Sequence, residues 1–237
     1  MSGGRFLADL LNQSAAPLRD RLLLAVFAAG VPVPLSIGFG TVVEGFVAGS
    51  VGVVGKNLSY GLASLLVLGG LAVVLGDEER RAAMAIGWPS RTERRWALVG
   101  FPIGTGLYLA ATALTSAAGM PMEGYDYGLS DPLTVGAVLF GAVLVSPIAE
   151  EVLFRGLLLG SLLGREWNPF LAGAASILAF GLLHAALLGV AGVIAMSAWA
   201  VVPTVLRLRF DGLSGAWLVH QLNNLWAYVG VVALGLG

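Results

Sequence analysis

Two adjacent glutamates, Glu150 and Glu151, follow an uncharged run from Pro132 to Ala149. A charged side chain near the centre of a bilayer costs at least about 2.5–3.5 kcal/mol on insertion scales, so two of them need partners or a function. Arg155 follows Glu151 by four residues, a spacing at which two side chains meet on one face of a helix. The sequence therefore predicts a Glu151–Arg155 ion pair.

Glu150 points about 100° away from Glu151 around the same helix, so it has no counter-charge within that helix. A buried carboxylate of this kind is a candidate general base. The alternative is an acid pair that only holds neighbouring helices together. Pro147 removes a backbone donor just upstream, which frees a carbonyl near Val143 and predicts a kink or local opening.

The only two histidines, His184 and His220, both lie in apolar segments. Phe180 precedes His184 by four residues and Asn224 follows His220 by four, so each pair shares a helical face. Amide hydrolysis needs a base that deprotonates water and hydrogen-bond donors for the carbonyl oxygen that becomes negative. Glutamate and histidine can act as the base, and histidine and asparagine can act as the donors. The alternative is that both pairs only hold helices together through hydrogen bonds.

Two histidines and a carboxylate are also a known ligand set for zinc. Glu150, His184 and His220 are therefore the candidate zinc ligands, although the sequence does not decide whether a metal is bound. The chain has no cysteine, which excludes thiolate chemistry, disulfides and cysteine-based metal sites.

The composition indicates an integral membrane protein. Of the 237 residues, 57% are hydrophobic and only 11% are charged, against about 25% charged in an ordinary soluble domain. No basic tail or patch suggests a nucleic-acid partner. We predict an all-α, polytopic transmembrane helix bundle that forms a single membrane domain over residues 1–237.

About seven spans of the length that crosses a hydrocarbon core are expected. They are Leu22–Ala48, Leu58–Leu75, Trp96–Ala118, Leu133–Gly160, Phe170–Leu187, Val190–Leu206 and Leu213–Leu236. The fifth and sixth are separated only by residues 189–192, which must turn the chain without a polar residue. We predict that 1–21 is a cytoplasmic tail or interfacial helix, 22–132 three accessory spans, and 133–237 the catalytic core.

Arginine placement predicts that the N-terminus is cytoplasmic, because cytoplasmic connections collect basic residues. Arginines occupy the tail and every second connection, whereas Lys56 is the only basic residue in the connections assigned to the outer side. If residues 5–13 are helical, Phe6, Leu7, Leu10 and Leu11 share one face, which suits a helix lying in the inner interface.

Three motifs occur in order on the late spans: Glu-Glu-x-x-x-Arg at 150–155, Phe-x-x-x-His at 180–184 and His-x-x-x-Asn at 220–224. Together they resemble the CAAX protease and bacteriocin-processing family (CPBP, or Abi) of intramembrane endopeptidases, which is related to the type II CAAX prenyl endopeptidases. The resemblance covers about residues 133–230. Each motif alone is weak, but the ordered set is specific.

The resemblance implies that Glu150 and His184 activate a water molecule and that His220 and Asn224 stabilise the oxyanion. Glu151, Arg155 and Phe180 would then be supporting residues. The family has been described both as metalloproteases and as glutamate-dependent proteases, so it leaves the zinc question open.

The implied function is an intramembrane endopeptidase of a prokaryotic plasma membrane that cleaves a membrane-associated or lipid-anchored protein or peptide. Two alternatives use the same residues. One is a non-enzymatic immunity or partner-binding protein of this fold. The other is a proton-coupled transporter, in which intramembrane glutamate and histidine would relay protons.

Overall fold

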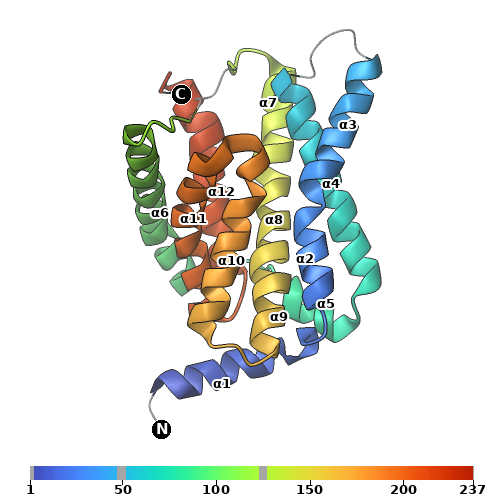
Figure 1. The fold of residues 1–237 in the computed structure, drawn as a ribbon, viewed down its shortest axis with the longest axis vertical. Coiled ribbons are helices and arrows are strands. Elements are labelled where there is room, and N and C mark those ends of the chain that lie inside the picture. The colour runs from blue at the N-terminus through green and yellow to red at the C-terminus, as the bar shows by residue number, and fades with distance from the viewer. Residues whose placement is uncertain (1–2, 47–51, 123–126, 237) are drawn as a thin grey trace.

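Helices make up all the regular secondary structure of the described residues, 3–46, 52–122 and 127–236, in this computed structural model. They form an upright bundle with α1 lying across one end (Figure 1), as the sequence predicts for an all-α membrane protein. In chain order the helices are α1 (Gly3–Ala15), η1 (Ala16–Leu18), α2 (Leu22–Gly30), α3 (Pro32–Phe46), α4 (Gly52–Val74), α5 (Asp77–Ala83), α6 (Arg91–Ala117), α7 (Pro132–Val138), η2 (Leu139–Val145), α8 (Ser146–Glu150), η3 (Glu151–Leu158), α9 (Leu159–Gly164), α10 (Pro169–Leu183), α11 (Ala185–Phe210), α12 (Ser214–Leu225), η4 (Trp226–Gly230) and α13 (Val231–Ala233).

Five helical stretches of the described chain are long and apolar enough to cross a membrane. They are Leu22–Val42, Gly52–Val74, Arg91–Ala117, Pro132–Gly164 and Ala185–Phe210. These correspond to the first four expected spans and the sixth. The fifth and seventh expected spans do not meet the same criterion, so a total of seven stays a prediction. The expected end of the first span, Ala48, lies outside the described residues.

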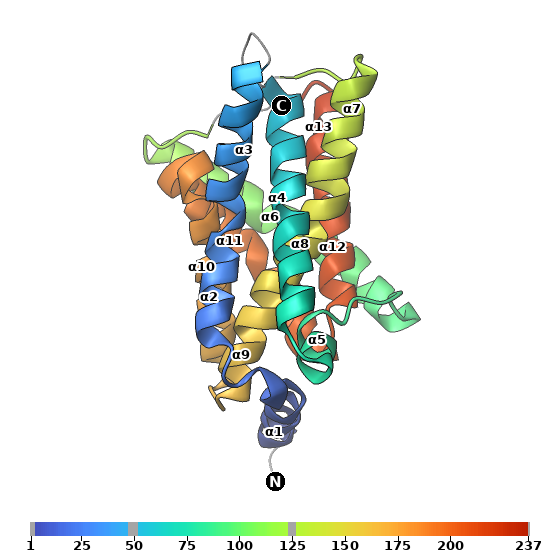
Figure 2. The same ribbon diagram turned by 90° about the vertical axis from the view of Figure 1, so that its right-hand side faces the viewer.

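The fifth expected span, Phe170–Leu187, corresponds to α10 and the first residues of α11. The helix α10 has only 15 residues and stops at Leu183, so at about 1.5 Å per residue it extends roughly 22 Å. The chain then turns at Gly189, whose φ of 61° and ψ of -160° are non-helical. Figures 1 and 2 both show this turn well short of the far ends of α3 and α7. The turn thus lies within residues 189–192, where the sequence predicts it.

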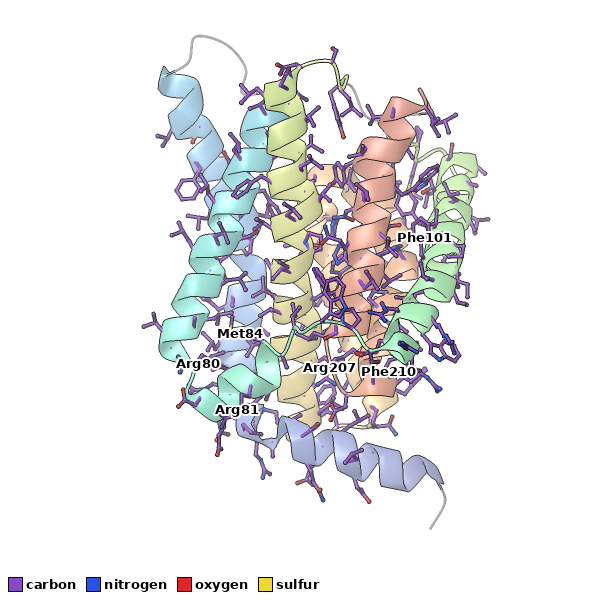
Figure 3. The ribbon with its side chains drawn as sticks, turned by 180° about the vertical axis from the view of Figure 1, so that it is seen from behind. Arg80, Arg81, Met84, Phe101, Arg207 and Phe210 are labelled. Carbon is purple, nitrogen blue, oxygen red and sulfur yellow. The ribbon has the colours of Figure 1, made fainter. Side chains whose placement is uncertain are left out.

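The N-terminal segment is fastened to the bundle by polar contacts at the end that α1 crosses. Arg21 forms two hydrogen bonds with the carboxylate of Glu79 on α5, at 2.7 and 3.1 Å, and Ser14 Oγ donates to Asp211 at 3.0 Å. Arg80 and Arg81 on α5 and Arg207 on α11 lie toward the same end (Figure 3). These arginines therefore lie at one end of the bundle, as expected for residues on one side of a membrane. The assignment of that end to the cytoplasm stays a prediction.

The hydrogen bond from Arg21 holds the pKa of the Glu79 carboxyl below its ordinary value of 4.5. A carboxyl whose pKa is lowered by folding contributes stability above its unfolded pKa and loses it as the pH falls through the folded pKa. We therefore expect acidification below about pH 4.5 to loosen the N-terminal segment, measured by limited proteolysis between Ala15 and Leu22. Glu79→Gln should be cleaved faster at neutral pH and lose this pH dependence, whereas Glu78→Gln should behave like wild type. Equal dependence in both variants would contradict this role for the ion pair.

The central helix runs continuously from Pro132 to Gly164, and its regular turns are interrupted by the π-helical segments η2 and η3. Pro147 lies between them, and the carbonyl of Val143 that it leaves free accepts a hydrogen bond from Gln221 Nε2 at 2.5 Å. The predicted free carbonyl near Val143 is therefore present, while the kink or local opening at Pro147 stays a prediction. π-Helical turns are frequent at functional sites, and here one ends five residues before Glu150 and the other begins at Glu151.

The helix α5 packs against the central helix at Gly156, so closely that an added Cβ would lie 1.9 Å from the backbone oxygen of Ala83. Glycine is therefore required at this contact. We expect Gly156→Ala to destabilise the protein by about 1–3 kcal/mol, because the clash is with backbone rather than with a flexible side chain. Gly69→Ala, where the added Cβ meets nothing within 4 Å, is the matched control in thermal unfolding. Equal unfolding temperatures for the two variants would refute the packing argument.

Candidate active site

Glu151 and Arg155 form the predicted ion pair in the interior of the bundle. Both side chains are fully buried, and Arg155 Nη1 lies 3.2 Å from Glu151 Oε1. Arg155 also donates to Thr204 Oγ1 and to the backbone oxygen of Ala200 on α11, each at 3.3 Å. A buried charge keeps its ionised form only when it is paired and hydrogen-bonded, and Arg155 meets both conditions.

His220 joins the two glutamates. Its Nδ1 lies 2.8 Å from Glu151 Oε1, and its Nε2 lies 3.6 Å from Glu150 Oε2. Because an ionised carboxylate only accepts hydrogen bonds, the Nδ1 atom must carry the proton that Glu151 receives. Glu151 therefore fixes the orientation of the imidazole and turns Nε2 toward Glu150. The ion pair between Glu151 and Arg155 is predicted from the sequence, but the contact between Glu151 and His220 is not.

Glu150 is 6% exposed and accepts a hydrogen bond from the phenol of Tyr60 at 2.9 Å. Its two oxygens thus face different partners, with Oε1 toward Tyr60 on α4 and Oε2 toward His220 on α12. The hydrogen bond between Tyr60 and Glu150 is not predicted from the sequence. No spacing or motif in the sequence links residues 60 and 150.

His184 lies at the C-terminal end of α10, where the chain leaves the helix before the turn at Gly189. Its Nδ1 is 2.9 Å from the backbone oxygen of Phe180, which assigns the proton to Nδ1 and leaves Nε2 as an acceptor. Glu150 is near enough to interact electrostatically with His184. No hydrogen bond or ion pair joins these two described side chains.

The ring of Phe180 lies at the centre of the cluster. Its centroid is 4.9 Å from the His184 ring and 6.0 Å from the His220 ring, and the Arg155 guanidinium lies 4.4 Å from it. Trp199 packs on His220 with ring centroids 4.6 Å apart. Phe180 therefore separates the two histidines and covers Arg155, which supports its expected role as a supporting residue.

Asn224 lies one helical turn after His220 and is nearly buried. Its Nδ2 donates to the backbone oxygen of Ala142 at 2.8 Å, next to the bond from Gln221 to Val143. One amide proton is thus used to bind the π-helical segment η2. An amide has two donor hydrogens, and this contact uses one of them.

A zinc site at Glu150, His184 and His220 does not fit this arrangement. The Glu150 and His220 side chains approach each other, but His184 contacts neither of them directly. Among the described residues, no group of three or more His, Asp or Glu side chains is placed to hold a metal ion.

An apolar groove of about 370 Å³ opens between α2, α3 and α10. Its wall includes Phe154 and Leu158 of η3 and Leu183, the neighbour of His184. The Phe154 ring meets the Phe180 ring edge-on at a centroid distance of 5.4 Å. Phe154 thus joins the wall of the groove to the Phe180 ring of the histidine and glutamate cluster.

Comparison with known proteins gives a family match over the part of the chain that carries the three motifs. Residues 132–226 match the family described as type II CAAX prenyl endopeptidase Rce1-like. The matched segment contains Glu150, Glu151 and Arg155, both histidines and Asn224, whereas Tyr60 lies outside it. Neither the curated proteins nor the solved structures include a match to this chain.

Proposed function

We propose that this chain, which carries a domain of the type II CAAX prenyl endopeptidase Rce1-like family at residues 132–226, is an intramembrane endopeptidase that uses Glu150 as its general base. The family is a protease family, so the finer proposal concerns the residues and their roles. The observation that carries it is the buried Glu150 carboxylate, whose Oε2 lies 3.6 Å from His220 Nε2.

In the proposed reaction, Glu150 takes a proton from a water molecule while the water oxygen attacks the carbonyl carbon of the scissile bond. His184 assists by accepting a hydrogen bond from the same water through Nε2. The tetrahedral intermediate then breaks its C–N bond, and Glu150 returns the proton to the leaving nitrogen. One water is consumed, and one carboxyl group and one amine are formed.

The oxyanion of that intermediate is stabilised by His220 and the free amide hydrogen of Asn224. In this proposal His220 donates through Nε2, while its Nδ1 donates to the carboxylate of Glu151. Arg155 holds Glu151 in place. Glu151 and Arg155 are thus positioning residues, which act on the reaction through His220.

The substrate is a membrane-associated or lipid-anchored protein or peptide. The apolar groove supports this class of substrate. It begins at α2 and α3 and reaches Leu183, the neighbour of His184. A lipid chain or an apolar peptide segment that binds there is removed from water, which is favourable. The protein acts within a membrane, as its five apolar helical stretches indicate.

The proposed function is tested by comparing membrane peptides from cells that contain wild-type protein or the Glu150→Ala, His184→Ala or His220→Ala variant. Each variant should accumulate an uncleaved precursor that the wild type processes. Insertion of every variant is checked by protease accessibility of the intact membranes. Normal processing by an inserted variant would remove the role assigned to that residue, and normal processing by all three would overturn the proposal.

A further inference from the structure

We propose that Tyr60 is a positioning residue for Glu150, and that α4 is therefore part of the catalytic unit although it lies outside the segment that matches the family. The inference rests on the proposed function, since it assigns a residue to the same site. It changes the role of the second span, which the sequence suggested to be accessory.

The first argument is the orientation of the Glu150 carboxylate. Glutamate has three side-chain torsions, and its carboxylate rotates unless an oxygen is held. The Tyr60 phenol donates to Oε1 at 2.9 Å, which leaves Oε2 directed at His220 Nε2. A base must present its oxygen to the water in one geometry, because small misplacements cost large factors in rate. Tyr60 supplies that fixed geometry from a second helix.

The second argument is the close approach of α4 to the central helix. A Cβ at Gly141 would lie 2.1 Å from the backbone oxygen of Asn57, and one at Gly61 would lie 2.8 Å from the Phe140 ring. Small residues let membrane helices approach this closely. Figure 2 shows α4 alongside the central helix, and the two elements are in contact. Both glycines are therefore needed to bring Tyr60 within hydrogen-bond distance of Glu150.

The direct test is Tyr60→Phe, which removes the hydroxyl and keeps the ring. Losing a hydrogen bond to a charged group should lower kcat about 10- to 100-fold. KM should stay within about twofold, because Tyr60 contacts Glu150 rather than substrate. The substrate is a synthetic copy of a membrane peptide that wild type cleaves and Glu150→Ala does not. Tyr127→Phe is the matched control, since that hydroxyl donates to the backbone oxygen of Tyr228, and it should keep wild-type kinetics.

A second variant tests the helix contact. Gly141→Ala should push α4 away and lower kcat to a similar extent, whereas Gly136→Ala on the same helix, where a Cβ meets nothing within 4 Å, should have little effect. In the double variant Tyr60→Phe/Gly141→Ala the two losses should not add, because both remove one interaction. Additive losses would show that Gly141 acts by another route.

A measurement that needs no substrate completes the test. Infrared difference spectra between unlabelled protein and protein with isotope-labelled glutamate should contain a band of the Glu150 carboxyl group. That band should disappear in Glu150→Gln and shift in Tyr60→Phe. An unshifted band in Tyr60→Phe would overturn the role of Tyr60. Full kcat in Tyr60→Phe together with an inactive Glu150→Ala would do the same and leave the proposed function standing. Cleavage by Glu150→Ala would instead overturn the proposed function, so the two failures are distinguishable.

Discussion

Replacing Glu150 by glutamine is expected to lower the rate of peptide cleavage about 100- to 10,000-fold, the range that general acid–base catalysis contributes. Glutamine keeps the size of the side chain and the oxygen that accepts from Tyr60, but it cannot take a proton from water. Because the substitution removes chemistry and preserves shape, the variant should insert and bind substrate like the wild type. The rate is measured on the purified protein in proteoliposomes.

The matched control for this variant is Glu78→Gln. Glu78 is an exposed residue of α5, far in the sequence from the glutamate pair, and its replacement should leave the cleavage rate unchanged. Cleavage by Glu150→Gln at the rate of Glu78→Gln would show that Glu150 is not the base. A fall in both rates would indicate a general effect of lost negative charge.

The second large effect is expected on stability. Arg155→Met should lower the free energy of unfolding by about 3–5 kcal/mol, because it leaves the charge of Glu151 buried without its counter-charge. Both side chains of this pair are 0% exposed, so water cannot replace the lost partner. The measurement is thermal or denaturant unfolding in detergent micelles, followed by tryptophan fluorescence.

Arg21→Met is the control for Arg155→Met, because it breaks an ion pair whose arginine side chain is 36% exposed. Pairs in contact with water contribute about 0–1 kcal/mol, so this variant should lose little stability. In the Glu151→Gln background, Arg155→Met should also cost much less than in the wild type. Similar losses for Arg155→Met and Arg21→Met would contradict the account of the buried pair.

The parts of the site that the sequence predicts correctly are the local ones. Glu151 and Arg155 meet because a helix brings residues four apart together, and the backbone alone enforces that contact. The free carbonyl near Val143 follows in the same way from the missing donor of Pro147. The partner of that carbonyl is Gln221 on α12, 78 positions away, which the local spacing does not identify.

The contacts that the sequence does not predict join residues that are distant along the chain. Tyr60 and Glu150 are 90 positions apart, and His220 and Glu151 are 69 apart. Their meeting depends on how α4 and α12 pack on the central helix, which glycine positions such as Gly141 decide. Helical periodicity carries no information on which neighbouring helix a given face will meet.

The extent of the spans was predicted only in part, for a related reason. A composition of apolar residues shows that a segment belongs in the membrane but does not show where each helix ends. The turn at Gly189 needs a positive φ, which glycine adopts freely. The glycines at 189–192 therefore predict the turn, whereas the end of α10 at Leu183 lies among apolar residues that give no signal for it.

The central claim is that this protein hydrolyses a peptide bond with water activated at Glu150. Its most direct test is to incubate the reconstituted protein with a membrane-peptide fraction in water enriched in oxygen-18 and to sequence the new C-termini by mass spectrometry. We predict peptides whose C-terminal carboxyl carries one labelled oxygen with the wild type and none with Glu150→Gln. Proton flux or partner binding without labelled C-termini, or equal labelling with both proteins, would contradict the claim.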